Sequence, residues 1–230
     1  MVLGFHHYAR SLNNKGNIDK ESLGYNEWME EDKTAFDKLS EIEKEVYSNC
    51  VEIEPQITAD IIDSVKESGG EMAGLECRMK TPSSVYEKIY NRPEKINIAD
   101  MNDIIRYTEV ADKDNLVGST KMTFDSLENK GYSIVKVKNT WTDVGNPYNG
   151  INVQLEAPNG QKFELQFHTQ ESFELKNSEA MHSLYEQARV LEPNSDEYFE
   201  IEDKMFELSD SLEVPVNIES IENHKRCPQD

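Results

Sequence analysis

Four residues before the middle of the chain have the types and spacing that bind a polyphosphate: two cations two positions apart, then a hydroxyl and a third cation four apart. They are Arg78, Lys80, Ser84 and Lys88. Apolar and polar residues alternate over 74–80, which predicts a strand, and Thr81-Pro82-Ser83 is typical of a helix start. The cations and the hydroxyl would then converge beside a helix N-terminus, which itself favours anions.

Two carboxylates in separate predicted strands complete a candidate site for phosphoryl transfer. Asp103 begins a strand predicted over 103–110, and Glu164 lies in a hairpin predicted over 150–169, with Asn-Gly at its turn. Mg²⁺-assisted transfer needs such a carboxylate pair facing cations, because acids hold the metal while metal and cations neutralise the phosphates. One carboxylate can also accept a hydroxyl proton. We therefore expect Mg²⁺ as the cofactor, with Asp103 and Glu164 as its ligands.

Apolar and polar residues alternate along both strands of the hairpin, so its polar residues share one face. For both apolar rows to face one core, the expected pairs are Glu156 with Glu164, Gln154 with Gln166, and Asn152 with His168. This register requires an odd-length loop or a bulge at Asn159–Gln161. Such a polar row is commonly an ordinary solvated face, but two opposed carboxylates repel each other and favour a cation site.

The hydrophobic pattern predicts the elements that must position these residues. Helices are expected at 33–47, 59–66, 84–92, 116–129, 171–189 and 196–212. Strands are expected at 74–80, 103–110, 132–138 and in both halves of the hairpin. This order predicts an α+β fold with a mixed, largely antiparallel β-sheet of about five strands flanked by helices. We divide the chain into a helical lead-in (1–70, loosely structured over 1–32), a core (71–192), and a C-terminal helix and tail (193–230), poorly ordered after Pro215.

Composition limits the partners of the chain. Its 24 Lys and Arg against 45 Asp and Glu give a formal net charge of −21, which argues against a broad nucleic-acid footprint. A nucleotide is still compatible, since a few cations beside a metal ion hold a triphosphate. The three cysteines form no CxxC pair, so neither a disulfide framework nor a zinc site is expected, and Cys77 is expected in the core. Without a long apolar N-terminal run we expect a cytoplasmic protein and no membrane partner, although a domain of a larger secreted toxin would have the same features.

The chain lacks the GxxxxGK[ST] and GxGxxG loops with which many proteins hold phosphates. Five segments between Gly74 and Arg189 instead resemble, in the same order, motifs of the RelA/SpoT synthetase family. Residues 78–88 resemble its RxKxxxS[IV]YxK segment, 102–105 its metal-binding Asp strand, 147–152 its GYxS[IL]H loop, 163–169 its E[IV]QIRT strand and 181–182 its MH pair. The resemblance implies a nucleotidyltransferase-like synthetase fold. No His-Asp dipeptide of the family's hydrolase domain occurs, which is typical of small stand-alone or toxin-type members.

The resemblance also implies a role for each matching residue. The residues that would bind ATP are Arg78, Lys80, Ser84 and Lys88. Asp103 would hold Mg²⁺, and Glu164 would be a second ligand or the base for the acceptor hydroxyl. The acceptor side would consist of Tyr148, stacked on the base, with Asn152, Gln166, His168 and Lys138. The implied reaction moves pyrophosphate from ATP to the 3′-hydroxyl of a purine nucleotide, giving AMP and an alarmone of the ppGpp or ppApp type.

The chain departs from the family on the acceptor side, so the donor is better defined than the acceptor. Asn152 replaces the family's His, His168 replaces its Arg, and the loop before Tyr148 is longer and carries Trp141. One alternative is a toxin that modifies the 3′ end of tRNA, which the acidic charge disfavours although residues 224–226 form a basic patch. Another is a catalytically silent nucleotide-sensing or interaction module, which would not need paired carboxylates. A second copy of the chain or a neutralising protein is a further expected partner.

Overall fold

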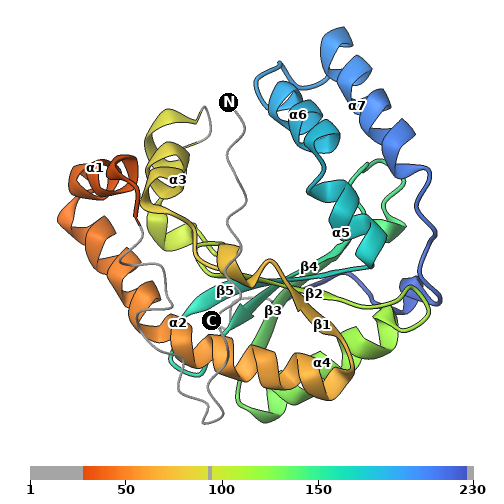
Figure 1. Ribbon diagram of the computed structural model, residues 1–230, viewed down its shortest axis with the longest axis horizontal. Helices are drawn as coiled ribbons and strands as arrows, with labels where there is room; N and C mark the ends of the chain where they lie inside the picture. The colour runs from red at the N-terminus through yellow and green to blue at the C-terminus, as the bar shows by residue number, and fades with distance from the viewer. Residues whose placement is uncertain (1–27, 93–94, 227–230) are drawn as a thin grey trace.

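The computed structural model describes residues 28–92 and 95–226, and within them six strands form one sheet (Figure 1). In spatial order the strands are β1 (Glu71–Ala73), β2 (Arg106–Val110), β5 (Lys162–His168), β4 (Ile151–Glu156), β3 (Ser133–Asn139) and β6 (His224–Lys225). Among these strands only β2 and β5 pair in parallel, and the other neighbours are antiparallel. The predicted α+β class with a mixed, largely antiparallel sheet is confirmed.

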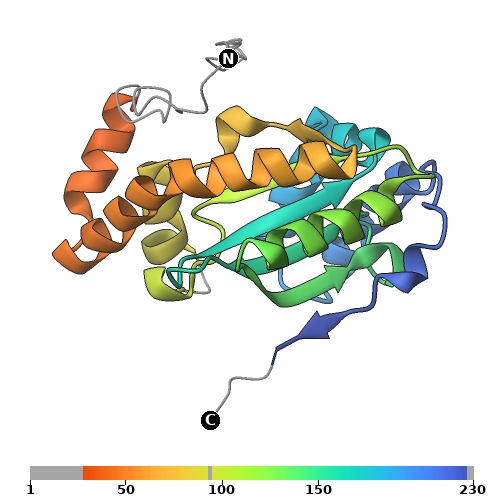
Figure 2. The same ribbon diagram turned by 90° about the horizontal axis from the view of Figure 1, so that it is seen from below.

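Helices cover one face of the sheet and stand at the two ends of the other (Figure 1). The covering pair, α2 (Glu41–Ser68) and α4 (Leu116–Asn129), lies side by side across the first face (Figure 2). At one end of the second face stand α1 (Glu30–Lys38) and α3 (Pro82–Tyr86), which continues as a π-helical turn over Glu87–Asn91. At the other end stand α5 (Gln170–Lys176), α6 (Glu179–Ala188) and α7 (Asp196–Ser209).

Alternating residues of β4 and β5 fill the core between the sheet and the covering helices. These inward residues, all fully buried, are Ile151, Val153, Leu155, Phe163, Leu165 and Phe167. Phe124 of α4 packs edge-on against Phe167, with ring centroids 5.5 Å apart. Because side chains alternate across a strand, the polar residues between them face the other side of the sheet.

The N-terminal helices differ from the two predicted at 33–47 and 59–66. The helix predicted at 33–47 is interrupted at Ser40, which starts α2 with a capping box. The Ser40 hydroxyl accepts from the Glu43 backbone N–H, and the Glu43 carboxylate accepts from the Ser40 backbone N–H. α2 then continues through Pro55 to Ser68 as one helix. Proline removes one helical hydrogen bond, and burial of the apolar face of α2 on the sheet outweighs that loss.

The predicted strand over 74–80 is wrong except at Met79, which forms an isolated antiparallel β-bridge with Ile105. The strand is β1, Glu71–Ala73, and Leu75–Cys77 form a 3-10 turn after Gly74, whose φ is 60°. This left-handed glycine turns the chain out of the sheet, which the alternation of side chains does not reveal. As a result Cys77 is exposed, and the prediction that it belongs to the core is wrong.

The hairpin has the predicted faces but not the predicted register. Its loop is the five residues 157–161, closed by the Ala157 N–H donating to the Gln161 carbonyl (2.8 Å). The predicted odd loop length is confirmed, but the loop is shorter than the expected pairing requires. The pairs are Glu156 with Lys162, Gln154 with Glu164, and Asn152 with Gln166. Glu156 and Glu164 do not oppose each other, so their expected repulsion gives no support to a cation site.

The predicted helix over 171–189 is two helices, because Ser178 lies between α5 and α6 and caps the second through the Met181 backbone. The tail after Pro215, expected to be poorly ordered, is packed: Ile218 and Ile221 are buried, and β6 pairs with β3.

Part of the predicted lead-in, residues 1–27, lies outside the described residues, as do 93–94 and 227–230. Within the described ranges, no helix combines the length and apolar character needed to cross a membrane.

Candidate active site

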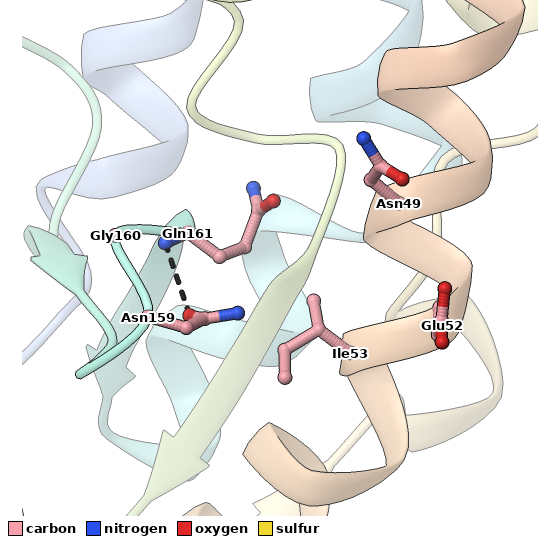
Figure 3. Close-up of a pocket in the computed structure, with 6 residues that line it drawn as sticks. All are labelled: Asn49, Glu52, Ile53, Asn159, Gly160 and Gln161. Carbon is pink, nitrogen blue, oxygen red and sulfur yellow. Dashed lines mark hydrogen bonds between the residues drawn. The ribbon is translucent and has the colours of Figure 1, made fainter.

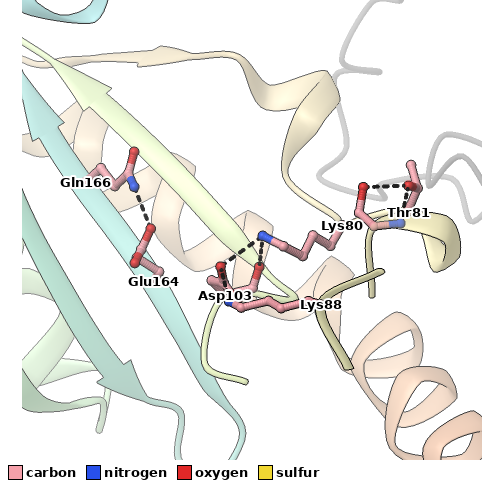
Figure 4. A network of polar contacts seen from close by, with 7 residues as sticks. Lys80, Thr81, Lys88, Asp103, Glu164 and Gln166 are labelled. Atoms are coloured by element: carbon pink, nitrogen blue, oxygen red, sulfur yellow. Dashed lines mark hydrogen bonds and ion pairs between the residues drawn. The ribbon is translucent and has the colours of Figure 1, made fainter. Parts of the chain in front are cut away.

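Two lysines converge on one carboxylate just before β2. The Lys80 backbone donates to the Ile104 carbonyl (2.8 Å), which holds it at the start of that strand, and Lys88 projects from the π-helical turn after α3. Their Nζ atoms lie 2.9 Å from Asp103 Oδ2 and Oδ1, respectively (Figure 4). Lys80 and Lys88, two of the four residues whose spacing predicts that they converge, therefore meet at Asp103.

Asp103 is held in its ionised form. Burial raises the pKa of its carboxyl, but the charges and hydrogen bonds of Lys80 and Lys88 outweigh burial and bring the pKa to about 2. Burial in turn lowers the pKa of the Lys80 ammonium, and the Asp103 charge opposes that effect. The two oxygens of a carboxylate offer about four lone-pair positions. Asp103 can thus contact a lysine and a metal ion together.

The other two predicted ATP ligands have hydrogen-bond partners outside this cluster. Ser84 is exposed, and its hydroxyl accepts a hydrogen bond from Thr81 Oγ1 (3.0 Å) at the cap of α3. The Arg78 guanidinium is buried, with its Nε 2.6 Å from Oε1 of Glu54 in α2. Glu54 is absent from the predicted residues, because nothing in its own helix indicates that it faces Arg78.

Glu164 lies next to the lysine cluster, on the strand parallel to β2. Its backbone N–H donates to the Ile105 carbonyl (3.0 Å), two residues after Asp103, and it pairs in register with Arg106. The two predicted catalytic carboxylates therefore come from adjacent segments at one end of the parallel pair (Figure 4). Gln166 of the same strand donates from Nε2 to Glu164 Oε1.

Two rows of polar residues cross this face of the sheet. One row is Lys136, Gln154, Glu164 and Arg106, and the next is Lys138, Asn152, Gln166 and Thr108. Lys176 of α5 adds another cation by donating to Gln166 Oε1. The cations absent from the predicted residues are Arg106, Lys136 and Lys176. Strand alternation identifies the first two, whereas no local pattern indicates that Lys176 reaches the sheet.

Tyr148 and His168 of the predicted acceptor side belong to one hydrogen-bonded group. The Tyr148 hydroxyl donates to Asn152 Oδ1 (2.8 Å) and lies 2.8 Å from His168 Nε2, while His168 Nδ1 lies 3.0 Å from Ser172 Oγ. Burial, aided by the Lys176 charge, lowers the pKa of His168 to about 3. His168 is therefore neutral at physiological pH and does not supply the charge of the family's Arg.

Replacing Gly150 by Ala will destabilise the protein by about 1–3 kcal/mol and loosen this group. A Cβ at Gly150 would lie 2.6 Å from His168 Cε1 and 2.9 Å from Tyr148 Oη, too close for either ring to stay in place. Urea unfolding measures the change. Gly118→Ala is the control, because a Cβ there meets nothing within 4 Å and Ala favours helix α4, so this variant gains about 0.5–1 kcal/mol. Equal stabilities for the two variants would contradict the tight packing around His168.

The donor set fits a magnesium ion bound together with a nucleotide. The described residues contain no group of three or more His, Cys, Asp and Glu side chains arranged to hold a metal. Mg²⁺ in nucleotide sites commonly takes one or two carboxylates and completes its shell with phosphates and water. Asp103 and Glu164 can supply those carboxylates.

Two surface pockets are lined by residues outside this cluster. One of about 480 Å³, between α2 and the hairpin loop (Figure 3), is lined by Asn49, Glu52, Ile53, Asn159, Gly160 and Gln161. The other, about 430 Å³, lies beside the π-helical turn, and Lys95 is the cation in its lining. Neither pocket has the cation cluster that a polyphosphate needs.

No protein-family model and no curated protein matches the sequence. Solved structures do match. The type VI effector Tas1, solved in complex with its immunity protein, is 23% identical over 75% of this chain and 97% of its own, with a TM-score of 0.58. The small alarmone synthetase 2 from Bacillus subtilis is 17% identical over 74% of this chain and 91% of its own, with a TM-score of 0.50.

These likenesses establish the fold of the chain as the RelA/SpoT-type synthetase fold. Within that class, the chain shares its fold with a small alarmone synthetase and with a type VI effector. The five resembling sequence segments imply the same fold.

Proposed function

We propose that the chain is a magnesium-dependent pyrophosphokinase that transfers the terminal diphosphate of ATP to the 3′-hydroxyl of a purine nucleotide. The observation that carries this proposal is the meeting of Lys80 and Lys88 on ionised Asp103, beside Glu164 on the parallel strand. Such cations suit the phosphates of ATP, and such carboxylates suit the metal ion bound to them. The fold shared with a small alarmone synthetase supports the same reaction.

Each residue of the cluster has a part in the proposed reaction. Lys80 and Lys88 donate to phosphate oxygens, and Asp103 would hold the magnesium ion. When bound, that ion neutralises phosphate charge. The acceptor 3′-oxygen attacks the β-phosphorus of ATP. The bond between this phosphorus and the oxygen that bridges the α- and β-phosphorus atoms breaks, and AMP leaves with that oxygen. The hydroxyl proton passes to the Glu164 carboxylate.

The acceptor nucleotide would lie over the two polar rows. Lys136 and Lys138 of β3 offer cations for its phosphates on the side of Glu164 away from the lysine cluster, and Arg106 of β2 lies beside Glu164 on the other side. A guanine or an adenine nucleotide would both fit this charge pattern. A tRNA acceptor is disfavoured by the net charge of −21, because a long phosphate backbone would meet repulsion outside the site.

A toxin role with a neutralising protein partner is part of the proposal. The supporting observation is the likeness to Tas1, a type VI effector solved with its immunity protein. The acidic surface of this chain would favour a basic partner, because opposite charges accelerate association.

One assay tests the reaction and identifies the acceptor. The protein is incubated with γ-labelled ATP, Mg²⁺ and, in separate reactions, GDP, GTP, AMP, ADP, ATP or bulk tRNA. Label that moves onto one acceptor, with an equal amount of AMP released, supports the proposal and names the substrate. Folded protein that binds ATP but forms no AMP with any acceptor would overturn the proposal in favour of a silent nucleotide-sensing module.

Lys80→Ala will weaken binding of MgATP by roughly 10- to 100-fold, because a charge-assisted hydrogen bond to phosphate contributes about 1.5–3 kcal/mol. Calorimetric titration with a non-hydrolysable ATP analogue and Mg²⁺ measures the Kd. Lys162→Ala is the matched control, since Lys162 is an exposed lysine at the hairpin end of β5. An unchanged Kd in Lys80→Ala would remove Lys80 from the ATP site.

A further inference from the structure

Gln166 connects Glu164 to a lysine on another element. Its side-chain amide is almost fully buried, 5% exposed, and both ends of it are hydrogen-bonded. The Nε2 end donates to Glu164 Oε1, and the Oε1 end accepts from Lys176 Nζ. A chain of two hydrogen bonds therefore runs from the Lys176 ammonium through one amide to the Glu164 carboxylate.

The charges at the two ends decide which way the amide points. In the flipped orientation, the amide oxygen would face the Glu164 carboxylate, and the amide NH₂ would face the Lys176 ammonium. Both contacts would be repulsive, so a single orientation is stable. Without the ammonium, only one of these two restraints is left. Gln166 could then turn away, and Glu164 would lose the donor that occupies its Oε1.

Lys176 is held firmly enough to act as such a restraint. It ends α5, which follows β5 directly and begins with Thr169, whose hydroxyl accepts from the Ser172 backbone (3.1 Å). Ser172 also bonds to buried His168. The Lys176 Nζ lies 6.0 Å from the centre of the Tyr148 ring.

The ammonium of Lys176 is costly to keep at this position. Burial and the nearby Arg106 charge lower the pKa of Lys176 to about 8, and the Glu164 charge opposes this. Within the described residues, no carboxylate lies at ion-pair distance from its Nζ. Its polar contact in the structure is the hydrogen bond to Gln166.

We propose that Lys176 is a positioning residue: it orients Gln166, which engages Glu164 Oε1 and leaves Glu164 Oε2 directed to the reacting groups. This inference deepens the proposed function and rests on it for the role of Glu164. Lys176 acts through Gln166 and not by contact with the acceptor. The two residues are therefore expected to behave as one unit when they are replaced.

A double-mutant cycle tests this unit. The variants are Lys176→Met, which keeps the aliphatic stem without the charge, Gln166→Leu, and the two combined. Each single change will lower kcat by about 10- to 100-fold, the range seen for groups that orient a ligating side chain, and leave the KM for ATP unchanged. The double variant will be no slower than the slower single variant. Lys176→Arg will recover part of the loss, because its guanidinium can donate to the same oxygen.

Two results would overturn the proposal. One is a double variant whose loss equals the product of the single losses. The other is a Lys176→Met loss that appears as a raised KM for the acceptor, which would place Lys176 on the acceptor itself. Lys162→Met, on the exposed end of β5, serves as the control for removal of a lysine charge.

Urea unfolding of the same four proteins separates this inference from the proposed reaction. If the wild type makes no AMP with any acceptor, the proposed reaction fails. The unfolding midpoints then test whether Lys176 and Gln166 are coupled. A double variant whose midpoint falls by less than the sum of the single shifts supports coupling through Gln166. Additive shifts overturn it whether or not the protein is active.

Discussion

Replacing Glu164 by Gln will slow diphosphate transfer by a factor of roughly 10² to 10⁴ and leave folding and ATP binding nearly unchanged. Gln has the same shape, and its amide oxygen can still accept the hydrogen bond from Gln166 Nε2. The variant loses the negative charge, and with it the capacity to take up the acceptor proton or hold a metal ion. Because this loss affects the transition state, it will fall on kcat and not on the KM for ATP.

AMP release at saturating ATP and acceptor gives kcat, and urea unfolding of the same sample shows whether the fold is intact. Glu156→Gln is the matched control, since Glu156 lies on the same hairpin but pairs with Lys162 at its loop end. We expect this control to keep kcat within about twofold of the wild type, as for a surface change away from the site. A Glu164→Gln variant with a tenth or more of the wild-type kcat would contradict the assignment of Glu164 as base.

Helices that begin at a capping residue or end before a glycine could be predicted from the sequence. α4 has the predicted bounds of 116–129, and Gly131 follows it at a φ of 89°. The Thr81 cap of α3 is confirmed because its hydroxyl accepts from the Ser84 backbone three residues later. Spacing alone also brought Lys80 and Lys88 to one place, since both are close in sequence to the α3 cap.

Features set by distant pairing could not be predicted in this way. The hairpin register depends on a loop of five residues, 157–161, and the alternating pattern accepts several odd lengths. The pairing of Arg78 with Glu54 joins residues 24 apart on different elements. Lys176 reaches the site because α5 folds back over the sheet, and its own helix has no pattern that marks it.

Net charge and local charge differ in this molecule, and the difference has a physical basis. Acidic residues dominate the chain, yet the face that carries Asp103 and Glu164 collects lysines and an arginine from five segments. Salt screens interactions beyond about 8–10 Å, so a ligand in the site responds mainly to these nearby cations. The surrounding acids act on large polyanions approaching from a distance. A small nucleotide can therefore bind where a nucleic acid is repelled.

Replacing Glu54 by Ala will lower the free energy of unfolding by roughly 3–5 kcal/mol, the cost of breaking a buried ion pair from one side. Glu54 is fully buried in α2, and its Oε1 accepts from Arg78 Nε at 2.6 Å and from Thr58 Oγ1. Tyr107 of β2 also contacts this carboxylate through its hydroxyl. The Ala variant removes the charge that neutralises the Arg78 guanidinium and leaves a cavity between α2 and the sheet.

A second variant removes the ion pair without leaving a cavity or a single buried charge. In Glu54→Leu combined with Arg78→Met, both charged groups are replaced by apolar side chains that fill much of the same space. Buried ion pairs replaced in this way commonly lose little stability, so the double variant should unfold at a higher urea concentration than Glu54→Ala. If the two unfold together, neither the cavity nor the removal of the Glu54 charge causes the loss, because the double variant compensates for both. If Glu54→Ala loses less than about 1 kcal/mol, the contact between α2 and the segment before α3 does not depend on this ion pair.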